Sequence, residues 1–178
     1  MTVSLVLTVI ADDHPGLVSA LADEIAAFEG NWTETRMASL AGKFAGILLV
    51  TVPESRADAL IAALRELELV GMHLVIERSA GASALPASRM LELELTGQDR
   101  PGIVRDISHL LAERGINIEE LETACISGSF SGEALFRVQA RLRVPRQLET
   151  AELRSALEAL ANELMVDINL DEAAAAAH

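Results

Sequence analysis

The chain of 178 residues is 51% hydrophobic and carries a formal net charge of −13, from 27 acidic and 14 basic residues. This length accommodates one ordinary domain or two small ones. The acidic balance and the lack of a basic cluster argue against direct binding of DNA or RNA, because nucleic-acid phosphates attract Lys and Arg.

The first half of the chain predicts an alternation of strands and helices. Apolar alternation predicts four strands, over Val3–Ile10, Asn31–Leu40, Ile47–Val52 and Met72–Arg78. Helical spacing predicts two helices, with Leu17, Leu21 and Ile25 in the first and Leu60, Ile61, Leu64 and Leu67 in the second. Pro15 suits the first position of the first helix, where a missing N–H costs no hydrogen bond. The Gly-x-Phe-x-Gly segment Gly42–Gly46 predicts a hairpin turn with a buried Phe44.

The second half repeats this order of elements. Its strands are predicted over Met90–Thr96, Asn117–Ile126, Ala134–Val144 and Met165–Leu170. Its helices carry Ile103, Ile107, Leu110 and Leu111, then Leu153, Leu157, Leu160 and Leu164, with Pro101 at the start of the first. The order β-α-β-β-α-β, found twice, predicts an α+β protein of two tandem ferredoxin-like domains with antiparallel sheets. We expect domains at 1–79 and 90–172, an Ala-, Ser- and Gly-rich linker at 80–89, and a tail at 173–178.

A direct comparison of the two halves supports a duplication. Asp13-His14-Pro15-Gly16 aligns with Asp99-Arg100-Pro101-Gly102 at a shift of 86 residues, and the same shift aligns Asn31 with Asn117. It also aligns Gly42–Gly46 with Gly128–Gly132, a second Gly-x-Phe-x-Gly segment. Farther along the shift grows to 93, as for Met72 and Met165, and we place the extra residues around 140–146.

The turn after the first strand of each half resembles that of the ACT domain family. Leu95–Val104 is similar to the family's first strand and turn, and Gly115–Ile118 to the start of its second strand. The first half departs from this pattern, with His14 in place of the basic residue and Glu29–Trp32 in place of Gly-hydrophobic-Asn. The resemblance covers nearly the whole chain. It implies ACT-type domains that bind amino acids or other small effectors and pair through their sheets.

The tandem without a catalytic domain also resembles a regulatory subgroup of this family. Members of the subgroup repress transcription by contacting a DNA-binding activator, with glycine as the signal. The resemblance therefore implies a glycine-responsive regulator of amino-acid metabolism that acts through a protein partner.

The residues themselves favour a ligand site at each Pro-Gly turn. Gly102 has no Cβ, so a ligand can approach its backbone. The helix that starts there presents unpaired N–H groups and the positive end of its dipole to a carboxylate. Asn117 offers a donor and an acceptor, and Asp99 can orient the turn or meet an ammonium group, so a free α-amino acid fits this chemistry. The candidate ligand-binding residues are Asp99, Arg100, Gly102, Ile103, Val104 and Asn117, with Asp13, His14, Gly16, Leu17, Val18 and Asn31 in the first half.

Structural roles remain open for several of these residues. Asp13 and Asp99 can simply cap the helices, and Asn31 and Asn117 can simply shape the turn into a strand. Cys125 is expected to be a buried, inert thiol inside a strand. The acidic run of Glu119, Glu120 and Glu122 is expected to be a solvated edge rather than a pair of catalytic carboxylates.

No motif indicates catalysis, a metal or a cofactor. The histidines lack zinc-site spacing with a nearby acid, and the chain has no nucleophile elbow, P-loop or dinucleotide fingerprint. Apolar runs are shorter than the roughly 18–20 residues of a membrane-spanning helix, and the N-terminus has no signal-peptide pattern. A single cysteine excludes an intrachain disulfide. We therefore expect a cytoplasmic protein that is not an enzyme.

Three functions stay open at this point. The first is an amino-acid sensor that modulates a protein partner, such as a transcription activator, and forms a homodimer. The second is an oligomerisation or adaptor module without a small ligand. The third, an enzyme on a ferredoxin-like scaffold, has no catalytic motif in its favour, and we prefer the sensor.

Overall fold

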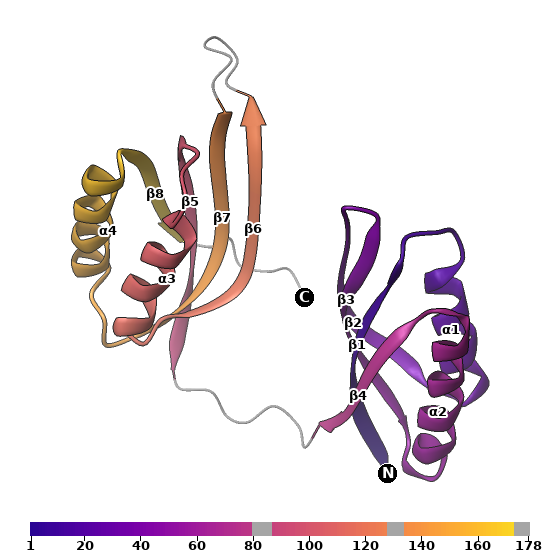
Figure 1. Ribbon diagram of the computed structural model, residues 1–178. Coiled ribbons are helices and arrows are strands. Elements are labelled where there is room, and N and C mark those ends of the chain that lie inside the picture. Colours follow the sequence, from indigo (N-terminus) through magenta and orange to yellow (C-terminus); the bar gives the residue numbers. More distant parts are fainter. Residues whose placement is uncertain (80–86, 128–133, 173–178) are drawn as a thin grey trace. The chain divides into compact units, whose positions relative to one another are not determined.

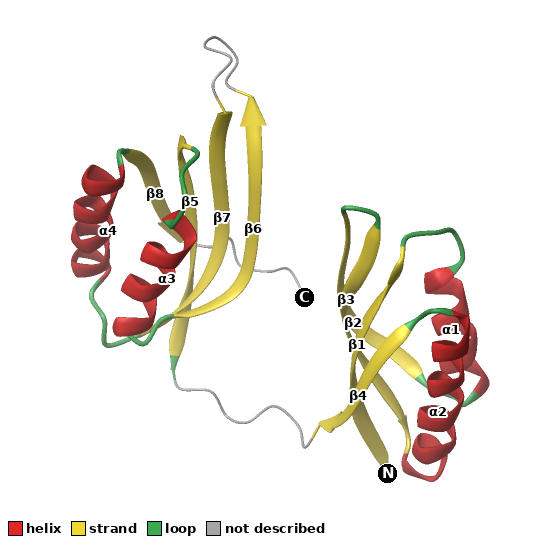
Figure 2. Ribbon diagram, viewed as in Figure 1, coloured by secondary structure: helices red, strands yellow, loops and turns green. Residues whose placement is uncertain are grey.

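Each half of the chain folds into a four-stranded antiparallel sheet with two helices on one face (Figure 1, Figure 2). The computed structural model describes residues 1–79, 87–127 and 134–172. The chain divides into two compact units, Met1–Ala84 and Leu85–His178. The predicted α+β class and tandem ferredoxin-like topology are confirmed.

The first unit has the predicted order of elements and the sheet order β2-β3-β1-β4. Its strands are β1 (Thr2–Asp12), β2 (Asn31–Leu40), β3 (Lys43–Pro53) and β4 (His73–Ser79). Its helices are α1 (Leu17–Ala27) and α2 (Glu54–Glu66), followed by a short 3-10 helix, η1 (Leu67–Val70).

The second unit repeats this arrangement with the sheet order β6-β7-β5-β8. Its strands are β5 (Ser88–Gln98), β6 (Asn117–Ser127), β7 (Ala134–Pro145) and β8 (Val166–Glu172). Its helices are α3 (Ile103–Glu113) and α4 (Thr150–Leu164). Across the described ranges, no helix is long and apolar enough to cross a membrane.

The hydrophobic core of each unit lies between the sheet and its two helices. In β1, Leu5, Leu7 and Val9 are buried and alternate with outward-facing residues, because successive side chains of a strand point to opposite faces. Helix α1 packs Leu21 and Ile25 against them at a spacing of four residues. Among the described residues every buried side chain is hydrophobic. Groups that bind a ligand or a partner must therefore lie at the surface.

The hairpin between β2 and β3 differs from the prediction. Strand β3 begins at Lys43, so the turn consists of Ala41 and Gly42, with φ of 51° and 78°, and Gly42–Gly46 is mostly strand. Phe44 is half-buried against the core instead of fully buried. The corresponding prediction for Gly128–Gly132 lies outside the described residues.

The strand register also corrects the alignment of the two halves. Thr8 pairs with Ile47 and Glu94 pairs with Gln139, so the shift is 86 residues in the first strand but already 92 in the third. Six extra residues of the second half therefore precede β7, and their predicted place around 140–146 is wrong. The structural counterpart of Phe44 is accordingly Phe136, not the phenylalanine of the second Gly-x-Phe-x-Gly segment.

Candidate functional site

Both Pro-Gly turns start their helices in the same way. Gly16 and Gly102 are the N-cap residues, with φ of 103° and 100° and ψ of −10° and −8°, a left-handed conformation that suits glycine. Because the cap glycine turns the chain, the helical conformation begins only at the residue after it. Pro15 and Pro101 therefore precede the caps, and their predicted place at the first helical position is wrong.

The first N–H groups of α1 and α3 are left without partners inside the helices. No side chain caps either helix. The first intrahelical bonds run from the N–H of Ala20 to the carbonyl of Gly16 and from the N–H of Asp106 to the carbonyl of Gly102, both 2.9 Å. Three earlier N–H groups in each helix therefore point out of its end, together with the positive end of the dipole. This arrangement attracts a carboxylate or another small anion.

Asp13 and Asp99 tie the turns to the neighbouring hairpin, so the alternative that they cap the helices is wrong. The hydroxyl of Ser39 donates a hydrogen bond of 2.5 Å to Oδ2 of Asp13. The thiol of Cys125 donates to Oδ2 of Asp99 over 3.6 Å. The backbone N–H of each aspartate also donates to a carbonyl of that hairpin, at 2.9 Å and 3.3 Å. The partners were missed from the sequence, although Ser39 and Cys125 align at the same shift of 86.

Cys125 is exposed on β6, so its predicted burial is wrong. Strand β6 lies at the edge of its sheet, where a side chain beside the turn is only partly covered. Partial desolvation of the sulfur, followed by the negative charge of Asp99 and the hydrogen bond to it, raises the pKa of the Cys125 thiol above its usual value. The thiol is therefore poorly ionised, which agrees with an inert role.

The basic position of the turn differs between the units. His14 is exposed, and its Nδ1 lies 3.1 Å from the carbonyl oxygen of Pro15. Arg100 is half-buried and forms no ion pair within the part of the chain that the structure describes. Nearby, Arg105 is paired with Asp106 at 2.8 Å, and this contact raises the pKa of the Arg105 guanidinium. The turn of the second unit thus carries the stronger positive charge.

The two residues that follow each cap glycine differ in what they can offer to a ligand. Leu17 and Ile103 are buried in the cores, so they can offer a ligand only their backbone. Val18 and Val104 are 47% and 38% exposed. Val104 also lines a narrow apolar crevice between α3 and β6, together with Ile107, Ser108, Leu111, Ile118 and Leu121. The crevice encloses about 10 Å³, about the space of one water molecule, so an amino acid bound there needs cover from another surface.

Asn31 and Asn117 do not join the turns of their own units. Asn117 starts β6 opposite Arg143, which in turn pairs with Met90 near the start of β5, whereas the turn follows the other end of β5. Figure 1 shows α3 running back between these two ends. Eight residues along β5 separate Met90 from Gln98, about 26 Å at the usual rise of a strand. The same register separates Asn31 from the turn of the first unit.

Two of the three glutamates in the acidic run of β6 are ion-paired rather than simply solvated. Arg143 contacts Glu119 at 2.8 Å, and Arg141 contacts Glu120 at 3.4 Å. The amide of Asn117 donates a hydrogen bond of 2.5 Å to Oε1 of Glu119. These cross-strand contacts hold the edge strand to β7. Across residues 1–79, 87–127 and 134–172, no group of His, Cys, Asp and Glu side chains has the arrangement of a metal site.

Curated relatives match most of the chain. The glycine cleavage system transcriptional repressors of Escherichia coli K12 and Shigella flexneri are each 23% identical over 164 residues, covering 90% of this chain and 85% of the relative. The similarity thus extends over most of the length of both proteins.

Solved structures share the fold over both units. The crystal structure of an unknown protein from Galdieria sulphuraria has a TM-score of 0.86 and 34% identity, covering 98% of this chain and all of that one. A structure assigned as a glycine cleavage system transcriptional repressor has a TM-score of 0.69 and 20% identity, covering 96% and 97% of the two chains. The ACT domain model matches residues 4–76 and again residues 89–171. The chain therefore belongs to the ACT domain family and carries two copies of its domain.

Proposed function

We propose that the chain is a cytoplasmic regulatory protein that binds a small free amino acid, glycine first among the candidates, at its Pro-Gly turns. Binding alters its contact with a protein partner, for which a DNA-binding transcription activator is the first candidate. The observation that carries this proposal is the pair of uncapped helix N-termini behind cap glycines of nearly identical backbone conformation.

The chemistry of the turns supports a ligand with a carboxylate. Three unpaired N–H groups and the helix dipole favour a negative charge at each turn. In the second unit, Arg100 adds a positive charge, and Asp99 is within the same turn to meet an ammonium group. The crevice beside Val104 encloses only about 10 Å³, so a ligand bound at this turn must itself be small.

The position of Asn117 supports a site shared between two copies of the chain. Within one unit the asparagine and the turn lie at opposite ends of the sheet, so a single ligand cannot touch both. A second copy of the chain would have to supply the asparagine. This requirement is the reason why we include a homodimer in the proposal.

A protein partner is favoured over direct nucleic-acid binding. The net charge of −13 repels phosphates. The curated relatives are named transcriptional repressors, so a link to transcription fits a protein intermediary. For the amino acid to regulate that contact, it must bind the partner-competent and incompetent states with different affinity.

Isothermal titration calorimetry and thermal unfolding of the whole chain test the proposal. We expect saturable binding of glycine or serine and none of glycinamide, in which the carboxylate is replaced by a neutral amide. A ligand present at 100 times its Kd stabilises the folded state by about 2.7 kcal/mol. Gly16→Ala and Gly102→Ala should each remove binding at one turn, since an added Cβ obstructs the approach to the backbone.

A matched variant controls for backbone strain. Gly71 also has a positive φ of 90°, with no atom within 4 Å of an added Cβ, and it lies outside both turns. Gly71→Ala therefore imposes comparable strain and should leave binding unchanged. Equal affinity for glycine and glycinamide would contradict the turn as a carboxylate site. No binding of any of the twenty amino acids at millimolar concentration would favour the ligand-free adaptor module.

A further inference from the structure

The sheet of the first unit has one face that its helices leave uncovered, and the centre of this open face is apolar. It carries Val6, Thr8, Ile10, Ile47, Leu49 and Val75, which alternate with the core residues of β1, β3 and β4. We propose that this open face is a self-association surface, on which a second copy of the chain packs with the same face. The inference does not depend on whether the chain binds an amino acid.

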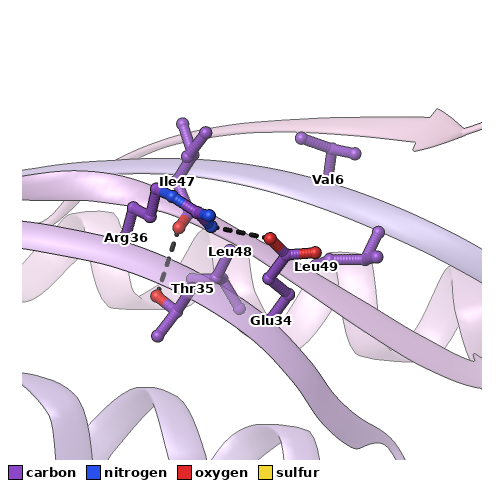
Figure 3. A pocket seen from close by; sticks show the side chains of 7 residues that line it. All are labelled: Val6, Glu34, Thr35, Arg36, Ile47, Leu48 and Leu49. Carbon is purple, nitrogen blue, oxygen red and sulfur yellow. Dashed lines mark hydrogen bonds and ion pairs between the residues drawn. The ribbon is translucent and has the colours of Figure 1, made fainter. Parts of the chain in front are cut away.

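Exposure and shape both single out the open face. Ile10, Ile47 and Val75 are 45%, 52% and 59% exposed, although such side chains are usually buried. Figure 3 shows Val6, Ile47 and Leu49 projecting to the same side of the sheet, while Leu48 projects to the other. Beside them runs a groove of about 220 Å³, whose polar margin is the ion pair between Arg36 and Glu34 at 2.6 Å. The groove is therefore apolar, and the charges of Arg36 and Glu34 at its margin already neutralise each other.

The second unit shows that the fold does not require an apolar open face. The row Val75–Thr8–Ile47 corresponds by register to Asn169–Glu94–Gln139. The row Glu77–Val6–Leu49 corresponds to Asp171–Glu92–Arg141. Every apolar residue of these two rows thus has a polar or charged counterpart in the same topology. Because the second unit folds with a hydrophilic open face, the apolar residues of the first need another explanation than folding.

The open face of the first unit of another copy fits this surface better than the open face of a second unit or a nucleic acid does. The open face of a second unit would bring charged residues such as Glu92 and Arg141 against apolar residues, and removing charged groups from water is costly. A nucleic acid would meet no free cluster of basic residues there. An identical face offers apolar surface to apolar surface, which is the self-complementarity that a two-fold interface requires.

Aligned packing of two sheets gives this pairing a definite geometry. A two-fold axis parallel to the strands and midway between β1 and β3 lays β1 of one copy over β3 of the other. Val6 of one copy then faces Leu49 of the other, since these two residues are register partners. The same axis lays β2 of one copy over β4 of the other, so Arg36 lies opposite Val75 and Glu34 lies opposite Glu77, and Arg36 in the adjacent row offsets part of the negative charge of these two glutamates.

The size of the face indicates a concentration-dependent complex. Four strands at about 4.8 Å spacing and eight residues at about 3.3 Å cover about 500 Å². Two copies together bury about 1,000 Å², which is the lower limit for a specific interface. We therefore expect association that weakens on dilution rather than a permanent complex.

Sedimentation analysis of the whole chain over a concentration series tests the proposal. Val6→Glu and Leu49→Arg, each of which introduces the type of residue found in the second unit, should each raise the dissociation constant at least about 30-fold, because each buries an unpaired charge. An equimolar mixture of the two variants should regain the complex, since the glutamate of one copy then faces the arginine of the other. If the chain also associates through another surface, sedimentation shows two association steps. Each single variant then weakens only one of these steps, and the mixture of the two variants restores it.

Two controls separate this result from misfolding. The reverse change in the second unit, Glu92→Val, should leave the association constant unchanged. The unfolding temperatures of Val6→Glu and Leu49→Arg should stay close to that of the unaltered chain when all three are dilute, because glutamate and arginine are accommodated at the equivalent positions 92 and 141. The proposal is overturned by a chain without concentration-dependent association, by association that survives both variants, or by a mixture that fails to recover it.

Discussion

Oδ2 of Asp99 lies 3.6 Å from the thiol sulfur of Cys125, and the equivalent Asp13 accepts a hydrogen bond from Ser39. In both units the donor stands on the second strand of its unit, and the acceptor precedes the Pro-Gly turn. The pair therefore fixes the turn to the sheet while the helix N-terminus stays open. Serine and cysteine fill the same position because either can donate one hydrogen bond to a carboxylate.

The aspartate controls the reactivity of the thiol. Asp99→Asn removes a negative charge that raises the pKa of Cys125, so that pKa should fall and more thiolate should be present at pH 8. We expect iodoacetamide to alkylate the variant faster than the unaltered chain. Asp13→Asn in the other unit should leave the rate unchanged. An unchanged rate in Asp99→Asn would contradict the contact between Asp99 and Cys125.

Gly46 and Gly42 should differ in their tolerance of a side chain. A Cβ at Gly46 would lie 2.2 Å from the carbonyl oxygen of Arg36 and 2.6 Å from Cα of Met37, so Gly46→Ala must push β2 away from β3. We expect a loss of about 3 kcal/mol in the free energy of unfolding, at the upper end for overpacking. Gly42→Ala meets no atom within 4 Å, and its positive φ costs about 1 kcal/mol.

Urea denaturation measures both values. The two glycines are close in sequence and belong to the same hairpin, so a general effect of added side chains there would act on both. Equal losses in the two variants would show that close contact with β2 is not what selects glycine at position 46.

The topology was predictable because the apolar pattern of each element agrees with its place in the fold. Leu5, Leu7 and Val9 alternate as one face of a strand must, and Leu21 and Ile25 keep the spacing of a helix. The register of β7 was not predictable in the same way. An ungapped match between two Gly-x-Phe-x-Gly segments suggested an equivalence that only the pairing of strands could correct.

The site was predictable only as separate groups. The sequence indicates which residues start the helices, but the distance between Gly102 and Asn117 depends on how far β5 and α3 carry the chain. The contact between Asp99 and Cys125 joins residues 26 positions apart and depends on the same register. Such relationships follow from pairing across the sheet, for which local patterns carry no information.

The ion pair of Asp12 with Lys43 should give a small pH dependence to stability at acidic pH. The hydrogen bond and charge of Lys43 hold the pKa of Asp12 below its ordinary value of 3.8. A carboxyl with a lowered folded pKa stabilises the fold above its unfolded pKa, and this stabilisation disappears as the pH falls through the folded value. In an NMR titration, Lys43→Met should raise the pKa of Asp12 toward 3.8.

Two comparisons check the cause of that shift. Lys43→Arg keeps the charge and should keep the pKa of Asp12 low. High salt should raise that pKa in the unaltered chain, because both partners are exposed and their interaction is screened. A pKa that ignores both salt and Lys43→Met would exclude the ion pair as its cause.

Asn117 distinguishes a ligand-binding role from a structural one. Its amide donates to Glu119 at an exposed strand start, so Asn117→Ala should lower the free energy of unfolding by about 0.5–1 kcal/mol. If the asparagine reaches the turn of another domain, the same variant should also weaken glycine binding at least about tenfold, the equivalent of 1.4 kcal/mol.

Calorimetry on the folded variant Asn117→Ala measures the affinity, and chemical denaturation measures the stability. Glu119→Gln keeps an acceptor for the amide and leaves the asparagine in place, so it should leave the affinity for glycine unchanged, although the loss of its ion pair with Arg143 lowers the stability. A variant Asn117→Ala that is less stable but binds glycine with unchanged affinity would assign the residue to the turn alone, and the shared site would lose its asparagine.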